Sequence, residues 1–235
     1  MMRHRFDPFT VQAILFDLDG TLIDTDDAII EAWAGRLHWL SRDPHRFLRR
    51  LIMASETPTN AFITLLDVLH VDDDLFSLND RLRRLRGLRT PANFLAVDGV
   101  VDVVRALCER YPLAVVTTRS RWDSHAFMDQ YHIGDCFRAI ITHEDTVRLK
   151  PHPEPVHHAA QALGVPVERC LMVGDTTVDV LAAKRAGAMS VGVLCGFGER
   201  AELAWAGADA ILESTAELGA LLGLDCESAF QFGGE

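Results

Sequence analysis

The chain has 235 residues, of which 49% are hydrophobic and 24% are charged, a composition typical of a globular protein with an ordinary apolar core. The formal net charge of −11 argues against nucleic acid as the main partner, because phosphate backbones attract basic surfaces. No apolar run approaches the roughly 18 residues that a membrane span needs, so we expect no membrane partner.

The cysteines and the first residues indicate the compartment. The five cysteines are scattered, odd in number and contain no CxxC pair, which fits reduced thiols better than a disulfide framework. The start of the chain is basic, but acids arrive before any long apolar stretch, so it is not a signal peptide. We expect a cytoplasmic protein with a short lead-in over residues 1–10.

The stretch 11–25 contains the first predicted strand and the first candidate site residues. Residues 13–16 form a short apolar run, as expected for a strand buried on both faces of a parallel sheet. Asp17 and Asp19 follow, two residues apart, so their side chains can project to the same side of an extended segment. Two neighbouring carboxylates need a cation or a shared proton to coexist, and carboxyl ends of strands are where open α/β sheets bind ligands.

Residues 25–94 have the apolar spacing of four short amphipathic helices. Each predicted helix begins at a capping residue, three of them aspartates and one a threonine. These capping residues are Asp26, Asp43, Thr57 and Asp72. The segment therefore reads as an inserted all-α domain with a small bundle. A basic cluster in its fourth helix, residues 81–89, favours a solvated face, although it would also attract an anionic substrate.

After residue 95 the pattern alternates between helices and strands. Helices are predicted at 100–108, 155–163, 177–186 and about 215–222. A further helix follows the strand 113–116 and ends at about residue 131. Strands are predicted at 113–116, 139–141, 170–173, 190–193 and 210–212. This alternation predicts an α/β fold with a doubly wound parallel sheet. Residues 1–24 and 95–235 would form this core domain, and residues 25–94 the inserted cap.

Polar residues follow three more predicted strands. Thr117 and Thr118 end one strand and offer hydroxyl and backbone N–H groups to phosphate oxygens, although a simple Ser/Thr turn explains them equally well. Lys150, one of only two lysines, lies in a proline-rich loop. This indicates an ammonium group held in a defined position rather than a general solubilising charge. Asp175 leaves a third strand, and Asp179 can face the same way from the first helical turn. Acids at a helix start can be ordinary charges that answer the helix dipole. If they face the first acidic pair across the sheet, they would instead form a hard oxygen site of the kind that Mg²⁺ takes.

These four stretches resemble, in order, the four motifs of the haloacid dehalogenase-like hydrolases. The segment 16–25, Phe-Asp-Leu-Asp-Gly-Thr-Leu-Ile-Asp-Thr, resembles motif I of the phosphatase branch with a helical cap. Thr117 resembles motif II, Lys150 resembles the motif III lysine in its KPxPxP context, and the segment 173–179 resembles motif IV. The resemblance spans the core from about residue 11 to 222, and implies a Rossmann-like core with a cap inserted after motif I.

The resemblance also implies a role for each residue. Asp17 would be the nucleophile that forms an aspartyl-phosphate, and Asp19 would be the general acid and base. Mg²⁺ would be bound by Asp17, by the backbone carbonyl of Asp19 and by Asp175, with Asp179 as a ligand or a support. Thr117, Thr118 and Lys150 would hold the phosphate oxygens of the substrate.

We therefore expect a Mg²⁺-dependent phosphatase for a small phosphorylated metabolite, hydrolysing a phosphate monoester in the manner of phosphoglycolate phosphatase. Alternatives on the same fold are a β-phosphoglucomutase-like transferase, which Ile29 at the place of the mutase histidine disfavours, and an inorganic pyrophosphatase. Asp19 argues against dehalogenation, and a cap without lysine excludes a Schiff-base hydrolase. An alternative of another class is a non-catalytic protein that binds a phosphate ligand.

Overall fold

The computed structural model describes residues 7–24 and 94–224. The predicted cap helices and their arginine cluster lie outside these residues, so the four-helix insert and the domain boundaries stay predictions. Within the described part, Asp7 caps a short 3-10 turn, Pro8–Thr10, where the sequence suggested only a lead-in. No helix among the described residues is both long and apolar enough to cross a membrane.

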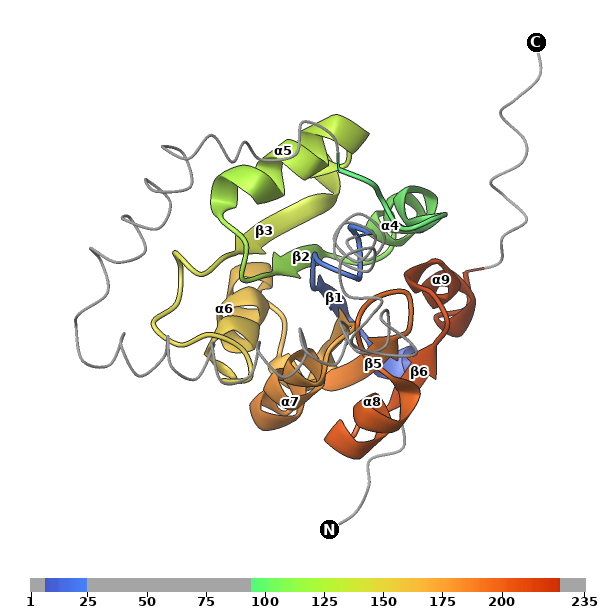
Figure 1. Ribbon diagram of the computed structural model, residues 1–235. Helices are drawn as coiled ribbons and strands as arrows, with labels where there is room; N and C mark the ends of the chain where they lie inside the picture. The colour runs from blue at the N-terminus through green and yellow to red at the C-terminus, as the bar shows by residue number, and fades with distance from the viewer. Residues whose placement is uncertain (1–6, 25–93, 225–235) are drawn as a thin grey trace, which may run out of the picture.

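A six-stranded parallel sheet forms the centre of the described structure (Figure 1). Its strands in chain order are β1 (Ala13–Phe16), β2 (Leu113–Val116), β3 (Phe137–Ile141), β4 (Cys170–Gly174), β5 (Met189–Val193) and β6 (Ala210–Leu212). In space their order is β3-β2-β1-β4-β5-β6. The strand order therefore reverses at β1, which has β2 on one side and β4 on the other, and the predicted doubly wound sheet is confirmed.

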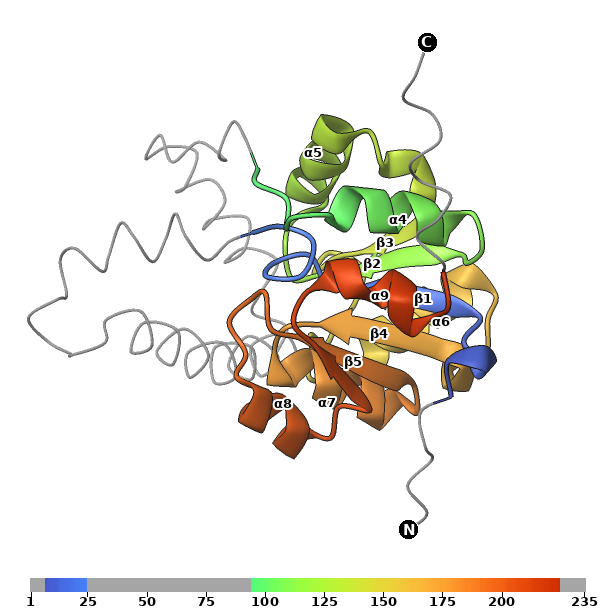
Figure 2. The ribbon, with the colours of Figure 1, turned by 90° about the vertical axis from the view of Figure 1, so that its right-hand side faces the viewer.

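Helices cover both faces of the sheet (Figure 2). They are α4 (Val100–Cys108), α5 (Arg121–Tyr131), α6 (Glu154–Leu163), α7 (Thr177–Ala186), α8 (Arg200–Ala206) and α9 (Leu218–Leu221). Helices α4, α5 and α9 pack with one set of strand residues, and α6 and α7 with the other. Helix α8 packs against α7 at the edge of the second layer.

Strand β1 shows why its sequence is apolar at every position. Ile14 and Phe16 belong to the core under α4 and α5, whereas Ala13 and Leu15 belong to the core over α6 and α7. All four side chains are fully buried, because a parallel strand between two helical layers has no solvent face. The chain can therefore place a polar residue only where the strand ends.

Most predicted elements have bounds within one residue of those expected, with three larger differences. Strand β3 begins two residues earlier than predicted, at Phe137, and the last helix is divided into a 3-10 turn, Thr215–Glu217, and α9. Helix α8 was not predicted. Helix α7 ends as expected at Gly187, which adopts the left-handed conformation with φ 84° that glycine tolerates best.

Candidate active site

The predicted site residues meet at the carboxyl edge of the sheet, around the central strand β1. Asp17 follows β1, Thr117 follows β2 and Asp175 follows β4. Because β1 pairs in parallel with both β2 and β4, these three strand ends are neighbours. The site therefore lies at the point where the strand order reverses, which is where doubly wound sheets bind their ligands.

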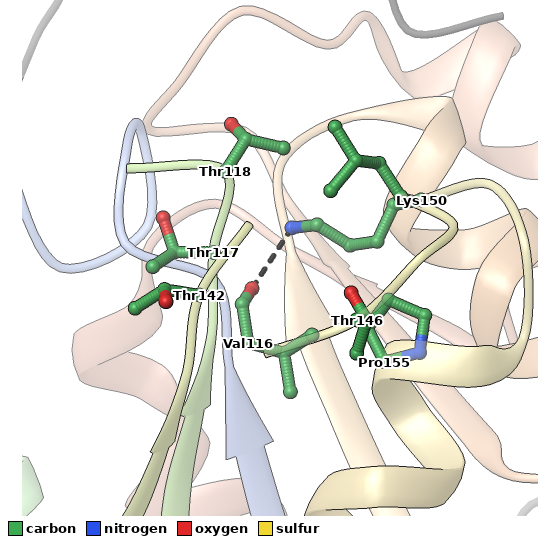
Figure 3. A pocket seen from close by; sticks show the side chains of 8 residues that line it. Val116, Thr117, Thr118, Thr142, Thr146, Lys150 and Pro155 are labelled. Atoms are coloured by element: carbon green, nitrogen blue, oxygen red, sulfur yellow. Dashed lines mark hydrogen bonds between the residues drawn. The ribbon is translucent and has the colours of Figure 1, made fainter. Parts of the chain in front are cut away.

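Lys150 connects the nucleophile candidate to the first turn of α7. Its Nζ atom lies 2.6 Å from Oδ1 of Asp17 and 2.5 Å from Oδ1 of Asp179. A third bond of 3.0 Å goes to the carbonyl oxygen of Val116 (Figure 3). All three ammonium hydrogens are thus used, and the lysine is only 4% exposed. A buried ammonium with this many acceptors is held in one place.

Asp179 is fixed from both sides. Its Oδ2 atom accepts bonds from the backbone N–H of Thr176, at 3.1 Å, and from the Thr176 hydroxyl, at 2.6 Å. Its other oxygen accepts from Lys150. These contacts cap the N-terminus of α7 and hold Lys150 in place. They fit the role of a support for the metal site, the alternative to Asp179 as a metal ligand.

Asp175 lies in a cradle that only glycine can form. Its Oδ2 atom accepts a 2.7 Å bond from the N–H of Phe197, in the loop after β5. A Cβ atom added at Gly20 or Gly196 would lie 2.3 Å or 2.1 Å from that oxygen, and one at Gly198 would lie 2.0 Å from the Asp175 carbonyl oxygen. The close approach of two loops to this carboxylate therefore requires these glycines.

Three buried carboxylates gather beside Lys150. Asp17, Asp175 and Asp179 each offer an oxygen, and these oxygens lie within 4.8 Å of one another. Burial raises the pKa of Asp17 to about 8; the Lys150 charge opposes this rise, whereas the Asp179 and Asp19 charges add to it. Burial would lower the pKa of Lys150, but Asp17 and Asp179 outweigh it and raise the pKa. When all three acids are ionised, they and the one ammonium would carry two negative charges, which one divalent cation would neutralise, so the donor set fits Mg²⁺.

The side chain of Asp19 points to a residue that the sequence interpretation missed. Arg119 donates from Nε to Oδ2 of Asp19 at 2.7 Å and from Nη2 to Oδ1 at 2.5 Å. Burial would lower the pKa of Arg119, but its hydrogen bonds to Asp19 and the charge of that residue raise the pKa overall. The only signal in the sequence was an arginine two residues after Thr117, and its partner is distant in the chain.

Thr117 and Thr118 line a shallow hollow beside Lys150 (Figure 3). Thr117 is buried and its hydroxyl accepts a 3.1 Å bond from the N–H of Arg119, whereas Thr118 is exposed. The remaining lining is mainly from the loop after β3, which also carries Lys150. The structure thus brings the two threonines and the lysine to one hollow, and the lysine also contacts Asp17.

Comparison with known protein families identifies the family of this chain. A family model described as haloacid dehalogenase-like hydrolase matches residues 14–193. The chain belongs to this family. The haloacid dehalogenase-like match runs from the second residue of β1 to the end of β5. It includes the acidic residues, the threonines, Arg119 and Lys150 of the site, and ends before the loop 196–198.

Several relatives cover almost the whole chain. Pyrophosphatase PpaX of Anoxybacillus flavithermus is 33% identical over 217 residues, which are 91% of this chain and 98% of that protein. The PpaX of Bacillus pumilus is 31% identical, covering 92% of this chain and 98% of that one. Among solved structures, a haloacid dehalogenase family hydrolase from Deinococcus radiodurans with bound phosphate and sodium is 25% identical, with a TM-score of 0.62 over 92% of this chain and 97% of that one. A predicted phosphoglycolate phosphatase from Haemophilus somnus, 21% identical with a TM-score of 0.65 over 90% of this chain and 98% of that one, shares the fold.

Proposed function

We propose that this haloacid dehalogenase-like hydrolase is a Mg²⁺-dependent inorganic pyrophosphatase that works through an aspartyl-phosphate on Asp17. The observation that carries the chemistry is the buried cluster of Asp17, Asp175 and Asp179 around Lys150. The choice of substrate rests on the near full-length relatives named pyrophosphatase at 33% and 31% identity. Pyrophosphate, which the sequence analysis held as an alternative, is therefore favoured over a phosphate monoester.

Asp17 and Asp175 would hold the metal ion, with Asp179 beside them. When bound, Mg²⁺ supplies the positive charge that lets an anionic carboxylate approach an anionic phosphate. The glycine cradle and the Phe197 N–H fix the position of the Asp175 carboxylate. Preorganisation of this kind avoids reorganising the ligands during the reaction.

In the first step, a carboxylate oxygen of Asp17 forms a bond to one phosphorus of pyrophosphate as the bond from that phosphorus to the bridging oxygen breaks. The electron pair of the broken bond stays on the bridging oxygen, which receives a proton from Asp19 and leaves as part of the first phosphate. Lys150, which contacts Asp17, and Thr117, which follows the neighbouring strand β2, would hold the oxygens of the transferred group.

In the second step, water attacks the phosphorus of the aspartyl-phosphate. Asp19 takes a proton from that water, the bond between phosphorus and Asp17 breaks, and the second phosphate leaves. Asp17 regains its carboxylate and Asp19 its proton, so the cycle closes with one water consumed and two phosphates released.

Phosphate release from pyrophosphate, with and without Mg²⁺, tests this proposal. The comparison substrate is p-nitrophenyl phosphate, a monoester with no second phosphate. We expect Mg²⁺-dependent turnover with a higher kcat/KM for pyrophosphate. A higher kcat/KM for p-nitrophenyl phosphate would return the assignment to a monoesterase, and binding of pyrophosphate without turnover would favour the non-catalytic alternative.

A further inference from the structure

Arg119 occupies both oxygens of the carboxylate that should act as general acid. Its Nε and Nη2 atoms form a two-pronged contact with Oδ2 and Oδ1 of Asp19, at 2.7 Å and 2.5 Å. A guanidinium matches a carboxylate in this bidentate way and matches a phosphate equally well. As long as the contact persists, neither oxygen of Asp19 is available to a leaving group.

The guanidinium of Arg119 lies over an aromatic ring whose backbone is held by hydrogen bonds. Its guanidinium carbon lies 5.7 Å from the ring centroid of Phe94, a distance at which a cation is attracted by an aromatic face. Phe94 is held through its backbone by Gln130, which donates to its carbonyl at 2.7 Å and accepts from its N–H at 2.9 Å, and by the Tyr131 hydroxyl at 2.8 Å. The guanidinium is therefore supported from a side that does not depend on Asp19.

The backbone of Arg119 is also anchored. Its N–H donates to the hydroxyl of Thr117 at 3.1 Å, and its carbonyl lies 3.2 Å from Nδ1 of His143. The side chains of Arg119 and Asp19 are 23% and 31% exposed, in contrast with 4% for Lys150. An anion from solution can thus reach this ion pair without displacing the buried cluster.

We propose that Arg119 exchanges Asp19 for the leaving group, and so selects substrates whose leaving group is itself an anion. The inference rests on the proposed phosphoryl transfer to Asp17. Pyrophosphate has such a leaving group, because its second phosphate carries oxygens that the guanidinium can hold in a bidentate way. As the phosphate takes over the guanidinium, the Asp19 carboxylate is released, takes up a proton from water, and can then donate that proton to the bridging oxygen.

A phosphate ester of a neutral alcohol has no anionic group in its leaving group for Arg119 to bind. Its leaving oxygen offers no second anionic group, so the contact between Arg119 and Asp19 stays closed and the general acid remains occupied. The same exchange would accept a leaving group that bears a carboxylate, because a guanidinium binds carboxylate and phosphate by the same geometry.

The test uses three substrates in the presence of Mg²⁺. Pyrophosphate and phosphoglycolate have anionic leaving groups, and 2-hydroxyethyl phosphate is an ester of similar size with a neutral one. In Arg119→Ala we expect kcat/KM for the first two to fall about 100-fold, whereas kcat/KM for 2-hydroxyethyl phosphate should not fall, because removing Arg119 frees Asp19 for this ester. Arg119→Lys keeps the charge but loses the bidentate donor geometry. It should recover part of the preference for substrates with an anionic leaving group.

The matched control is Arg121→Ala, which removes an arginine two residues away whose partner is Asp145; it should leave the substrate preference unchanged. A fall of equal size for all three substrates in Arg119→Ala would overturn the inference, since it would show only a general positioning role. If the wild-type protein hydrolyses the two esters but not pyrophosphate, the proposed pyrophosphatase function fails, and the ester pair still decides the role of Arg119. A wild-type protein that hydrolyses none of the three overturns both.

Discussion

The Nζ atom of Lys150 lies 2.6 Å from Oδ1 of Asp17, and the same atom lies 2.5 Å from Asp179. One ammonium therefore serves two buried acids from neighbouring parts of the sheet, one directly after β1 and one in the helix that follows β4. Alone, it cannot balance Asp17, Asp175 and Asp179 together. The site is thus built with a fixed nucleophile and an excess of negative charge, and the predictions below follow from these two properties.

Asp17→Asn should abolish turnover while the protein stays folded. The amide has nearly the shape of the carboxylate but is not a nucleophile, so we expect kcat to fall by roughly 10⁴- to 10⁶-fold. Phosphate release and far-ultraviolet circular dichroism check the two parts. Asp129→Asn, an exposed acid on α5, is the matched control and should keep full activity. Turnover at the wild-type rate in Asp17→Asn would refute the assignment of the nucleophile.

Lys150→Met should destabilise the metal-free protein as well as inactivate it. The variant leaves Asp17 and Asp179 buried without their cation, a change that typically costs about 3–5 kcal/mol of unfolding free energy. Denaturant unfolding in EDTA measures this loss. The control is Lys184→Met at the other lysine, whose partly exposed pair with Asp209 should contribute about 1 kcal/mol or less. Equal losses in the two variants would show that Lys150 does not carry the buried charge balance.

Gly196→Ala should weaken Mg²⁺ binding without removing any polar group. The new Cβ atom would lie 2.1 Å from Oδ2 of Asp175, so either the loop or the carboxylate must move. We expect at least about a 10-fold loss of Mg²⁺ affinity by calorimetry, equivalent to roughly 1.4 kcal/mol. Gly134→Ala is the control, because its Cβ atom would meet only ordinary contact with Met128 at 3.9 Å. Unchanged affinity in Gly196→Ala would remove Asp175 from the metal site.

Mg²⁺ should stabilise the protein more at high pH than at low pH. The pKa of Asp17 is raised from 3.8 to about 8, chiefly by burial, so the folded metal-free protein retains a proton that the unfolded chain releases. This contribution to stability is complete below pH 3.8 and is lost as the pH rises through 8, because between these values the folded state binds a proton that the unfolded chain has released. Because Mg²⁺ binds the ionised carboxylate, it competes with that proton.

Thermal unfolding at several pH values between about 6 and 8 measures this competition, by linkage of protons and metal to folding. The increase in Tm caused by Mg²⁺ should grow as the pH rises, and Asp17→Asn should abolish the growth. An increase that is the same at every pH would contradict a protonated Asp17 in the metal-free protein.

The sheet was predictable because burial on both faces leaves a local signature. Strand β1 is apolar at all four positions, and the polar residues that follow it mark the strand end. Helix α7 was predictable from local signals too, since Asp179 lies in its first turn and Gly187 caps its end. Helix α8 was missed because only seven residues, Arg200–Ala206, form it, and only Leu203 and Ala206 among them are buried.

The contact between Arg119 and Asp19 was not predictable from spacing. The two residues are 100 positions apart, and they meet only because β1 and β2 are neighbours in the sheet. The glycine cradle of Asp175 was equally hidden, because Gly196 and Gly198 fit an ordinary loop until the Asp175 carboxylate is placed against them. Local patterns thus predicted the elements, whereas tertiary contacts determine which side chains meet.

The most direct measurement of the central claim is a crystal structure of the protein with Mg²⁺ and beryllium fluoride, a mimic of a phosphoryl group on aspartate. The account predicts beryllium bonded to a carboxylate oxygen of Asp17, with Lys150 on the fluorines and one Mg²⁺ bound by Asp17 and Asp175. A fluoride complex that is not bonded to Asp17, or a Mg²⁺ ion bound away from Asp17 and Asp175, would contradict it.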